Sequence, residues 1–307
     1  MSVVSESPTG GLPSISPRRR RTDKIMRASL ALATGIALIP LVLILYYLLH
    51  KGLSAISSSF FTSDPNLSQC FPHVPGAPPP PPCNIGGIRS ALLGTLEIVG
   101  LATLIAVPIG IVVAQWLTEY GKESWYANVV RYFLDVMTGV PSIVFGLFVF
   151  TVLVVSHIGG DAVGWKGAIA LALLMLPIVA RSSEVVLQLV PSSLREAALA
   201  LGAPRWRVVT RIVLPTALPG LITGSLLAIA RGAGETAPLL FTIGAAHVFT
   251  ANLSQPMNSL PTQIFSDLGQ NTDAFINRAW ASALTLVALI LLLNLIARFV
   301  ARRSRLT

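Results

Sequence analysis

Long apolar blocks separated by short polar segments dominate the sequence. Each block has roughly 20 residues or more, the length that a helix needs to cross a bilayer. The blocks cover residues 28–49, 91–117, 132–156, 167–189, 215–244 and 279–300. The pattern therefore predicts an all-α membrane protein with six transmembrane helices, the fifth of which is interrupted by the charged stretch 231–235.

Composition and charge support a membrane protein and exclude two other classes. The chain is 53% hydrophobic and 11% charged, whereas soluble proteins carry about 25% charged residues. The net charge is +9, but the basic residues lie between apolar blocks, so no nucleic-acid partner is expected.

The first block follows an arginine run as in a signal peptide. It is too long for a signal core and no small-x-small cleavage site follows, so it is expected to be a retained span.

The basic residues also predict the direction of the spans. Sixteen of the twenty Lys and Arg residues in loops and termini fall on the side that carries both termini. Positive loops stay in the cytoplasm. We therefore expect a multi-pass membrane protein with both termini and the loop 191–214 in the cytoplasm, and the loop 50–90 outside.

Two segments differ in composition from the apolar spans of the transmembrane domain, which is expected to cover residues 27–301. Residues 1–26 are rich in Ser, Pro, Gly and Arg and are predicted to be a disordered basic tail. The external loop 50–90 contains five consecutive prolines, which favour a stiff spacer, although a partner-binding segment is an alternative. Cys70 and Cys83 share this loop, as a disulfide on an oxidising side or as two unpaired thiols.

The loop 191–214 carries the most specific motif. It reads Glu196-Ala197-Ala198-Leu199-Ala200-Leu201-Gly202, followed by nine residues and Ile212-Val213-Leu214-Pro215. Ser192 or Ser193 can cap a first short helix, Gly202 permits a turn with positive φ, and Pro204 suits the start of a second short helix. Leu199, Leu201 and Trp206 offer apolar anchors. The loop is therefore predicted to form a compact helix pair, with an amphipathic loop on the membrane surface as the alternative.

This motif resembles the EAA loop, E-A-A-x3-G-x9-I-x-L-P, of the permease subunits of ABC importers, and every fixed position matches. The resemblance implies a type I importer permease whose helix pair docks into an ATPase subunit. The residues that it assigns to this coupling are Glu196, Ala197, Ala198, Leu199, Gly202 and Trp206. The chain has no GxxxxGK[ST] phosphate loop. ATP is therefore expected to be used by a separate ATPase dimer, and no catalytic residue, cofactor or metal is predicted here.

Charged residues inside the spans are candidates for a substrate pathway. Arg181 lies near the inner end of the fourth span, and Arg231 and Glu235 lie four residues apart in the fifth. A charge at the bilayer centre costs about 2.5–3.5 kcal/mol, so such residues usually face the interior of a bundle. Arg231 and Glu235 are either an ion pair that braces a broken helix or part of an anion site, because arginine presents a forked donor to oxyanions.

A second resemblance narrows the substrate. The stretch from Arg231 through Glu235, Thr236 and Pro238 resembles the R-x-x-G-E-T-A-P segment of PstA-type permease subunits of bacterial phosphate ABC importers, and the stretch 139–146 resembles another of their signatures. Together these resemblances cover about residues 25–300. They imply that inorganic phosphate passes Arg181 and Arg231. The implied partners are a homologous second permease, the ATPase dimer, an external phosphate-binding protein and membrane lipid.

Two alternative functions remain open at this stage. A permease for another oxyanion, such as sulfate or molybdate, would share the EAA loop, and only the stretch 231–238 argues against it. An ion-coupled secondary transporter with Glu235 as its proton site belongs to another class, and the complete EAA loop argues against it. The dependence of uptake on ATP separates these two classes.

Overall fold

The computed structural model describes residues 17–66, 85–122, 124–270 and 272–303, and this part of the chain is almost entirely helical. Within it only Pro65 and Gly86 pair as an isolated β-bridge. The helices are α1 (Pro17–Ser54), α2 (Ser58–Thr62), α3 (Arg89–Gln115), η1 (Trp116–Gly121), α4 (Trp125–Gly139), α5 (Ser142–Val149), η2 (Phe150–Val155), α6 (Gly164–Gln188), α7 (Ser192–Ala200), α8 (Arg205–Val208), η3 (Val209–Val213), α9 (Leu214–Ala233), α10 (Ala237–Thr242), α11 (Leu260–Gly269) and α12 (Asp273–Arg303). The all-α class predicted from the sequence is confirmed.

Five helices in the described residues are long and apolar enough to cross a membrane. A sixth candidate is a pair, α4 with α5–η2, that is bent by 101° at its break. The predicted six spans are obtained when this pair counts as one. The five are Arg18–Ser54, Arg89–Gly121, Gly164–Gln188, Arg205–Ala233 and Asp273–Phe299.

The third and fifth spans differ from their predicted forms. The third was expected as one helix over 132–156, but α4 ends at Gly139 and α5 begins after Pro141, whose backbone is extended. Proline disfavours a helical conformation of the preceding residue, here Val140, which explains the break. The fifth was expected over 215–244, but α9 ends at Ala233 and α10 is a separate short helix, because two glycines and then Pro238 interrupt the pattern.

The chain divides into two compact units, residues 1–49 and 50–307. The first unit consists in its described part of most of α1, which begins at Pro17. Proline is favoured at the first position of a helix. The prediction of disorder for the tail 1–26 is therefore wrong for residues 17–26, and residues 1–16 lie outside the described part. The apolar side chains of α1 are largely exposed.

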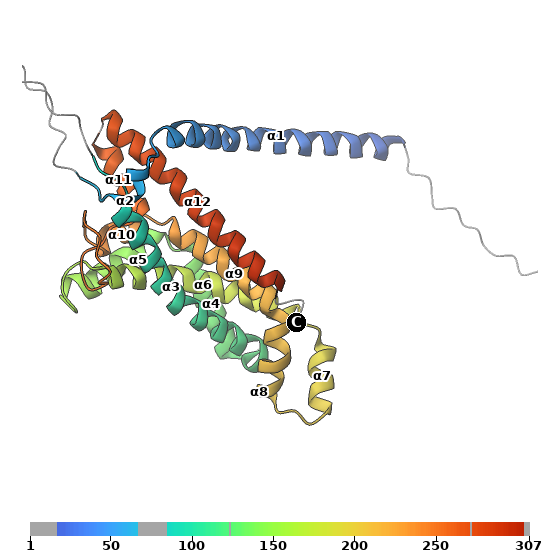
Figure 1. Cartoon of the computed structure of the whole chain (residues 1–307). Helices are drawn as coiled ribbons and strands as arrows, with labels where there is room; N and C mark the ends of the chain where they lie inside the picture. The colour runs from blue at the N-terminus through green and yellow to red at the C-terminus, as the bar shows by residue number, and fades with distance from the viewer. Residues whose placement is uncertain (1–16, 67–84, 123, 271, 304–307) are drawn as a thin grey trace, which may run out of the picture. The chain divides into compact units, whose positions relative to one another are not determined.

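Helix α6 is the centre of the second unit, with α3, α4 and α9 packed around it (Figure 1). Glycines allow the close approach. A Cβ on Gly110 of α3 would lie 2.8 Å from the Cβ of Val179, and one on Gly232 of α9 would lie 2.8 Å from the sulfur of Met175. The hydrophobic effect does not drive helices together in lipid. Small residues favour association instead, because they bring backbones into van der Waals contact.

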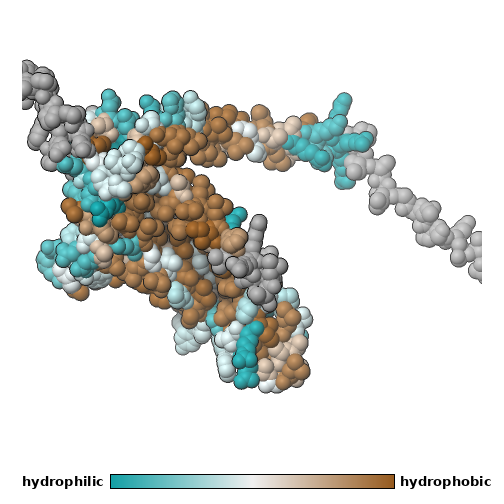
Figure 2. All heavy atoms as spheres, viewed as in Figure 1, coloured by the Kyte–Doolittle hydropathy of each residue, from teal (hydrophilic) through white to brown (hydrophobic). Residues whose placement is uncertain are grey.

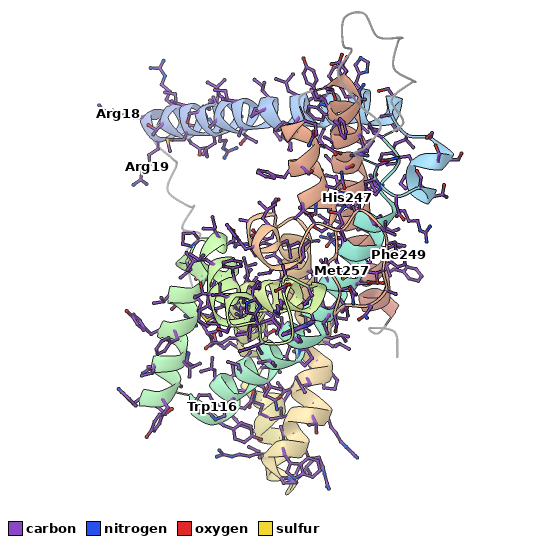
Figure 3. The ribbon with its side chains drawn as sticks, turned by 90° about the vertical axis from the view of Figure 1, so that its left-hand side faces the viewer. Arg18, Arg19, Trp116, His247, Phe249 and Met257 are labelled. Carbon is purple, nitrogen blue, oxygen red and sulfur yellow. The ribbon has the colours of Figure 1, made fainter. Side chains whose placement is uncertain are left out.

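The long helices of the second unit run between two ends. We call them the α7 end, with α7 and α8, and the α11 end, with α2, α10 and α11 (Figure 1). Hydrophobic side chains cover the visible sides of the long helices between them (Figure 2). Trp116 lies toward the α7 end, whereas His247, Phe249 and Met257 lie toward the α11 end (Figure 3).

Two basic residues at the α11 end are fully buried rather than exposed in loops. Arg278 of α12 donates to both carboxylate oxygens of Asp267 in α11 at 2.6 and 2.9 Å, and also to the carbonyl of Ile85. The Nζ of Lys166 donates to the carbonyls of Leu153, Gly160 and Asp161 at 3.0, 2.5 and 2.8 Å. Buried cations need such partners. These contacts fix the connections between helices at this end.

Candidate functional site

The first half of the EAA loop forms the predicted short helix. Helix α7 covers Ser192–Ala200, and Gly202 follows it with φ +80°, as expected for a turn that only glycine adopts easily. The predicted serine cap is wrong. Pro191 occupies the N-cap position, no side-chain cap bond forms, and Ser192 is the first residue of the helix.

The second half of the EAA loop is not a separate short helix. Helix α8 begins at Arg205, after Pro204, as predicted. It then runs through the π-helical turn η3 into α9, so that Arg205–Ala233 is one helical span. The turn at Gly202 is thus joined directly to the fifth span.

The EAA loop presents large apolar side chains on its surface. Ala198 faces inward and packs in a core cluster with Leu187 and Val208. Leu199 is 44% exposed, Trp206 58% and Leu201 88%. Glu196 and Ala197 are also exposed. Large apolar residues clustered on a surface indicate an interaction site.

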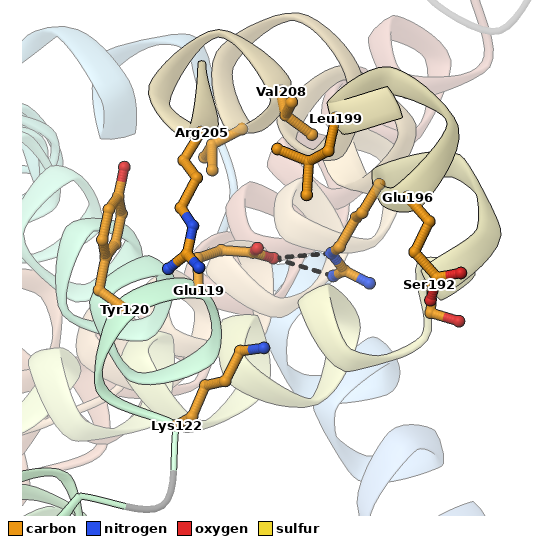
Figure 4. A pocket seen from close by; sticks show the side chains of 10 residues that line it. Glu119, Tyr120, Lys122, Ser192, Glu196, Leu199, Arg205 and Val208 are labelled. Carbon is orange, nitrogen blue, oxygen red and sulfur yellow. Dashed lines mark hydrogen bonds and ion pairs between the residues drawn. The ribbon is translucent and has the colours of Figure 1, made fainter. Parts of the chain in front are cut away.

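Arg195 ties α7 to the transmembrane helices. Its guanidinium pairs with Glu119 of η1 at 2.9 and 3.0 Å and donates to the carbonyls of Val190 and Leu187 at 2.6 and 2.8 Å. Arg195 and Glu119 border a cavity of about 180 Å³ that Glu196, Leu199 and Arg205 also line (Figure 4). Sequence reasoning missed this anchor, because Glu119 lies 76 residues away.

Arg181 does not lie alone in its span. Its Nε and Nη2 donate to the two carboxylate oxygens of Asp135 in α4, the first at 2.8 Å. Its Nη1 donates to Glu184 at 2.7 Å, and the other oxygen of Glu184 accepts from Arg131 at 2.6 Å. The four side chains form an alternating chain of two positive and two negative charges between α4 and α6. The sequence analysis did not identify Asp135 or Arg131 as members of this group.

Arg231 and Glu235 pair, but not on one helix face. Arg231 lies in the last turn of α9, whereas Glu235 lies after the helix end at Ala233. Their charged atoms are 3.6 Å apart, with the Arg231 side chain 51% exposed and that of Glu235 16% exposed. This contact agrees with the ion-pair alternative from the sequence, whereas the anion-site alternative stays a prediction. Thr236 is the N-cap residue of α10 and makes no side-chain cap bond.

The structure does not bring the two arginines together. Gly232 packs against Met175, and Gly224 packs against Ser182, so α6 and α9 run antiparallel. In this register Arg181 and Arg231 differ by about five residues, or about 8 Å along the helix axes. They belong to two separate ion-pair groups, with Arg181 on the side of the α7 end.

The predicted cysteine site is not covered, because Cys70 and Cys83 lie outside the described residues. The two signature stretches do meet, since α5 packs on α10 and a Cβ on Gly146 would lie 2.5 Å from the Cα of Pro238.

Comparison with known proteins agrees with this architecture. Residues 106–306 match the family described as binding-protein-dependent transport system inner membrane component. The chain is 40% identical over 290 residues to the phosphate transport system permease protein PstA of Yersinia pestis, covering 94% of this chain and 92% of that protein. It is 40% identical over 296 residues to PstA 1 of Mycobacterium tuberculosis strain CDC 1551 / Oshkosh, covering 94% and 92%.

Solved structures share the fold at lower identity. A chain of the bacterial alginate ABC transporter, in complex with its alginate pentasaccharide-bound periplasmic protein, superposes with a TM-score of 0.63 at 19% identity, covering 93% of this chain and 96% of that one. A chain of the inward-facing MetNI methionine ABC transporter gives 0.58 at 19% identity, covering 71% and 95%. With its EAA loop, its helical spans and these matches, the chain belongs to the binding-protein-dependent transport system inner membrane components, among the PstA-type phosphate transport system permease proteins.

Proposed function

We propose that this chain is a permease subunit of an ATP-driven importer of inorganic phosphate. It is a transport subunit that performs no covalent chemistry. The family supports this function, and one feature of the structure carries the mechanism: charged side chains are exposed on helices that are otherwise apolar. Asp135 is 59% exposed, Arg231 51% and Arg181 30%.

Charges exposed on spans cannot face lipid at low cost, because each costs about 2.5–3.5 kcal/mol at the bilayer centre. The face that carries them therefore needs a polar cover. We assign this cover to a homologous second permease, with a water-lined path for phosphate between the two subunits. An importer with two permeases needs such a path.

The EAA loop is the proposed contact with the ATPase. The exposed Leu199, Leu201 and Trp206 supply apolar anchors, and the small Ala197 permits close approach. Arg195 transmits a displacement of α7 to the ends of α6 and η1, since it contacts both. We infer from this role that the α7 end lies in the cytoplasm, and the excess of Lys and Arg on the side of both termini supports the same location for them. The α11 end then faces an external phosphate-binding protein.

The transport cycle follows from this arrangement. The binding protein releases phosphate at the α11 end. ATP binding closes the ATPase dimer, which displaces α7 and α8 and changes the side from which the path is open. Arg231, held by one long ion pair, is the residue proposed to meet the anion, with Glu235 and Thr236 beside it. Arg181 lies further toward the cytoplasm and meets the anion later.

Uptake of radiolabelled phosphate by sealed, right-side-out membrane vesicles distinguishes an ATP-driven importer from a secondary transporter. With the complete complex, vanadate is expected to abolish uptake, because it blocks the ATPase, and a protonophore is expected to leave uptake intact while ATP is supplied. Loss of uptake with the protonophore alone would contradict the proposal. Uptake of sulfate or molybdate in preference to phosphate would support the other-oxyanion alternative.

A further inference from the structure

We propose that Asp135 is a built-in substitute for the transported anion, which holds the fork of Arg181 until phosphate displaces it. This inference rests on the proposed function and adds a residue that controls how tightly phosphate binds at Arg181. The observation behind it is the two-point contact of the Asp135 carboxylate with Nε and Nη2 of Arg181. A phosphate group uses the same edge of arginine with two of its oxygens.

The two carboxylates on Arg181 are held very differently. Glu184 is 4% exposed, and its two oxygens accept from two arginines, Arg181 at 2.7 Å and Arg131 at 2.6 Å. Asp135 is 59% exposed, and among the described residues Arg181 alone donates to its carboxylate. Loss of Glu184 would leave Arg131 without an acidic partner in this group, whereas displacement of Asp135 leaves both arginines paired with Glu184. Asp135 is therefore the partner that an incoming anion can replace.

The position of Arg181 on its helix permits such an exchange. Ile178, Arg181 and Val185 lie at helical spacing on α6, and none of the three is fully buried, with Val185 58% exposed. Beside them Ser182 packs against Gly224 of α9, and the most extensive packing of α6 is with α3 and α9. The fork of Arg181 thus lies beside an open face, and Asp135 reaches it from α4 across that face.

The charge balance favours release as well as binding. With Asp135 in place, the group of Arg131, Arg181, Asp135 and Glu184 is neutral. When Asp135 turns away the group is left with one positive charge, and a phosphate monoanion restores neutrality. Because the Asp135 carboxylate competes for the same donors, it can displace bound phosphate again. The apparent affinity of Arg181 for phosphate is therefore reduced in proportion to the time that Asp135 occupies the fork.

The test is equilibrium binding of radiolabelled inorganic phosphate to the complete complex in nanodiscs, without the external binding protein. Asp135→Asn is expected to bind phosphate about tenfold more tightly than the unaltered complex and to turn over more slowly in uptake. Asp161→Asn is the matched control, since Asp161 is an exposed carboxylate paired only with the exposed His157 among the described residues. It is expected to change neither property.

A double-variant cycle tests whether the effect passes through Arg181. In an Arg181→Gln background, Asp135→Asn is expected to change phosphate binding less than twofold. Asp135→Glu keeps the charge but shifts the carboxylate, and about threefold tighter binding is expected even if the asparagine variant does not assemble. Unchanged or weaker binding by Asp135→Asn or by Asp135→Glu in an intact complex would overturn the inference and leave Asp135 as a tie between α4 and α6. Absence of ATP-dependent phosphate uptake in the unaltered complex would instead refute the proposed function.

Discussion

Gly146 in α5 lies directly against the backbone of Pro238 in α10: a Cβ on Gly146 would come within 2.5 Å of the Pro238 Cα and 3.2 Å of its carbonyl oxygen. Each residue belongs to one of the two stretches that resemble phosphate importer permeases. The contact joins the bent third span to the segment that follows Glu235. Backbone atoms cannot move aside as a flexible side chain can, so this position requires glycine.

Gly146→Ala is therefore expected to destabilise the complex by about 1–3 kcal/mol, as overpacking usually does. Thermal unfolding of the purified complex measures the effect. Gly139→Ala is the matched control, because a Cβ there meets no atom within 4 Å. A melting temperature for Gly146→Ala equal to that of Gly139→Ala would show that α5 and α10 separate readily.

A cysteine at Ser193 tests the proposed orientation. Ser193 is exposed on α7, and in a background without Cys70 and Cys83 it is expected to resist a membrane-impermeant thiol reagent added to intact cells. A cysteine at the exposed Ser254, toward the α11 end, is expected to react. The reverse labelling pattern would invert the whole topology.

The turn at Gly202 separates a backbone effect from a steric one. No atom lies within 4 Å of a Cβ built on Gly202, but its φ of +80° costs other residues roughly 1–2 kcal/mol. Gly202→Val is expected to stay in the membrane and lose transport, whereas Gly202→Asn, which adopts this conformation more easily, should keep most of it. Uptake and ATP hydrolysis are measured together. Normal uptake by the valine variant would mean that the turn geometry does not matter for coupling.

Arg195 and Glu119 allow the anchor of α7 to be weakened in steps. Arg195→Met removes the ion pair and both contacts to backbone carbonyls, and about 1–3 kcal/mol of stability is expected to be lost at this site. Glu119→Gln removes only the charge of the pair and should have a smaller effect. The number of phosphate ions imported per ATP hydrolysed is expected to fall in the order unaltered, Glu119→Gln, Arg195→Met. An unchanged ratio in Arg195→Met would exclude this route of coupling.

Arg231 and Glu235 can be neutralised together to distinguish bracing from anion binding. If the pair only braces the segment, Arg231→Gln with Glu235→Gln should transport normally, since replacing both members of a pair is often harmless. We expect normal membrane levels and no uptake. Arg231→Lys keeps the charge but loses the fork, and it should transport poorly. Full uptake by the double variant would show that the pair is structural, and the anion site would then have to involve Arg181 and Asp135.

The sequence was sufficient for features that depend on local order. The spacing of the EAA motif located α7, and the glycine in it predicted the positive φ at position 202. Partners from other helices could not be predicted in this way. Glu119 is 76 residues from Arg195, and Asp135 is 46 residues from Arg181, so their pairing depends on how α3, α4 and α6 pack.

The differences in helix limits have local physical causes. Apolar content alone marked 132–156 as one span, but the proline at 141 breaks it. The same criterion extended the fifth span past Gly234, but α9 ends there because glycine favours a helix less than other residues do. Lys166 and Arg278 were counted as loop charges, yet backbone carbonyls and Asp267 allow both to be buried.

The unbroken helix from Arg205 to Ala233 has the properties of a lever. With 29 residues it is about 44 Å long, so a tilt of about 10° around its midpoint moves each end by about 4 Å in opposite directions. Gly220 and Gly224 lie near the middle and rest on Val186 and Ser182 of α6. Glycines have no side chains that must repack when the helix tilts around this contact. A displacement of Trp206 at one end therefore moves Arg231 at the other end sideways, in the plane of the membrane.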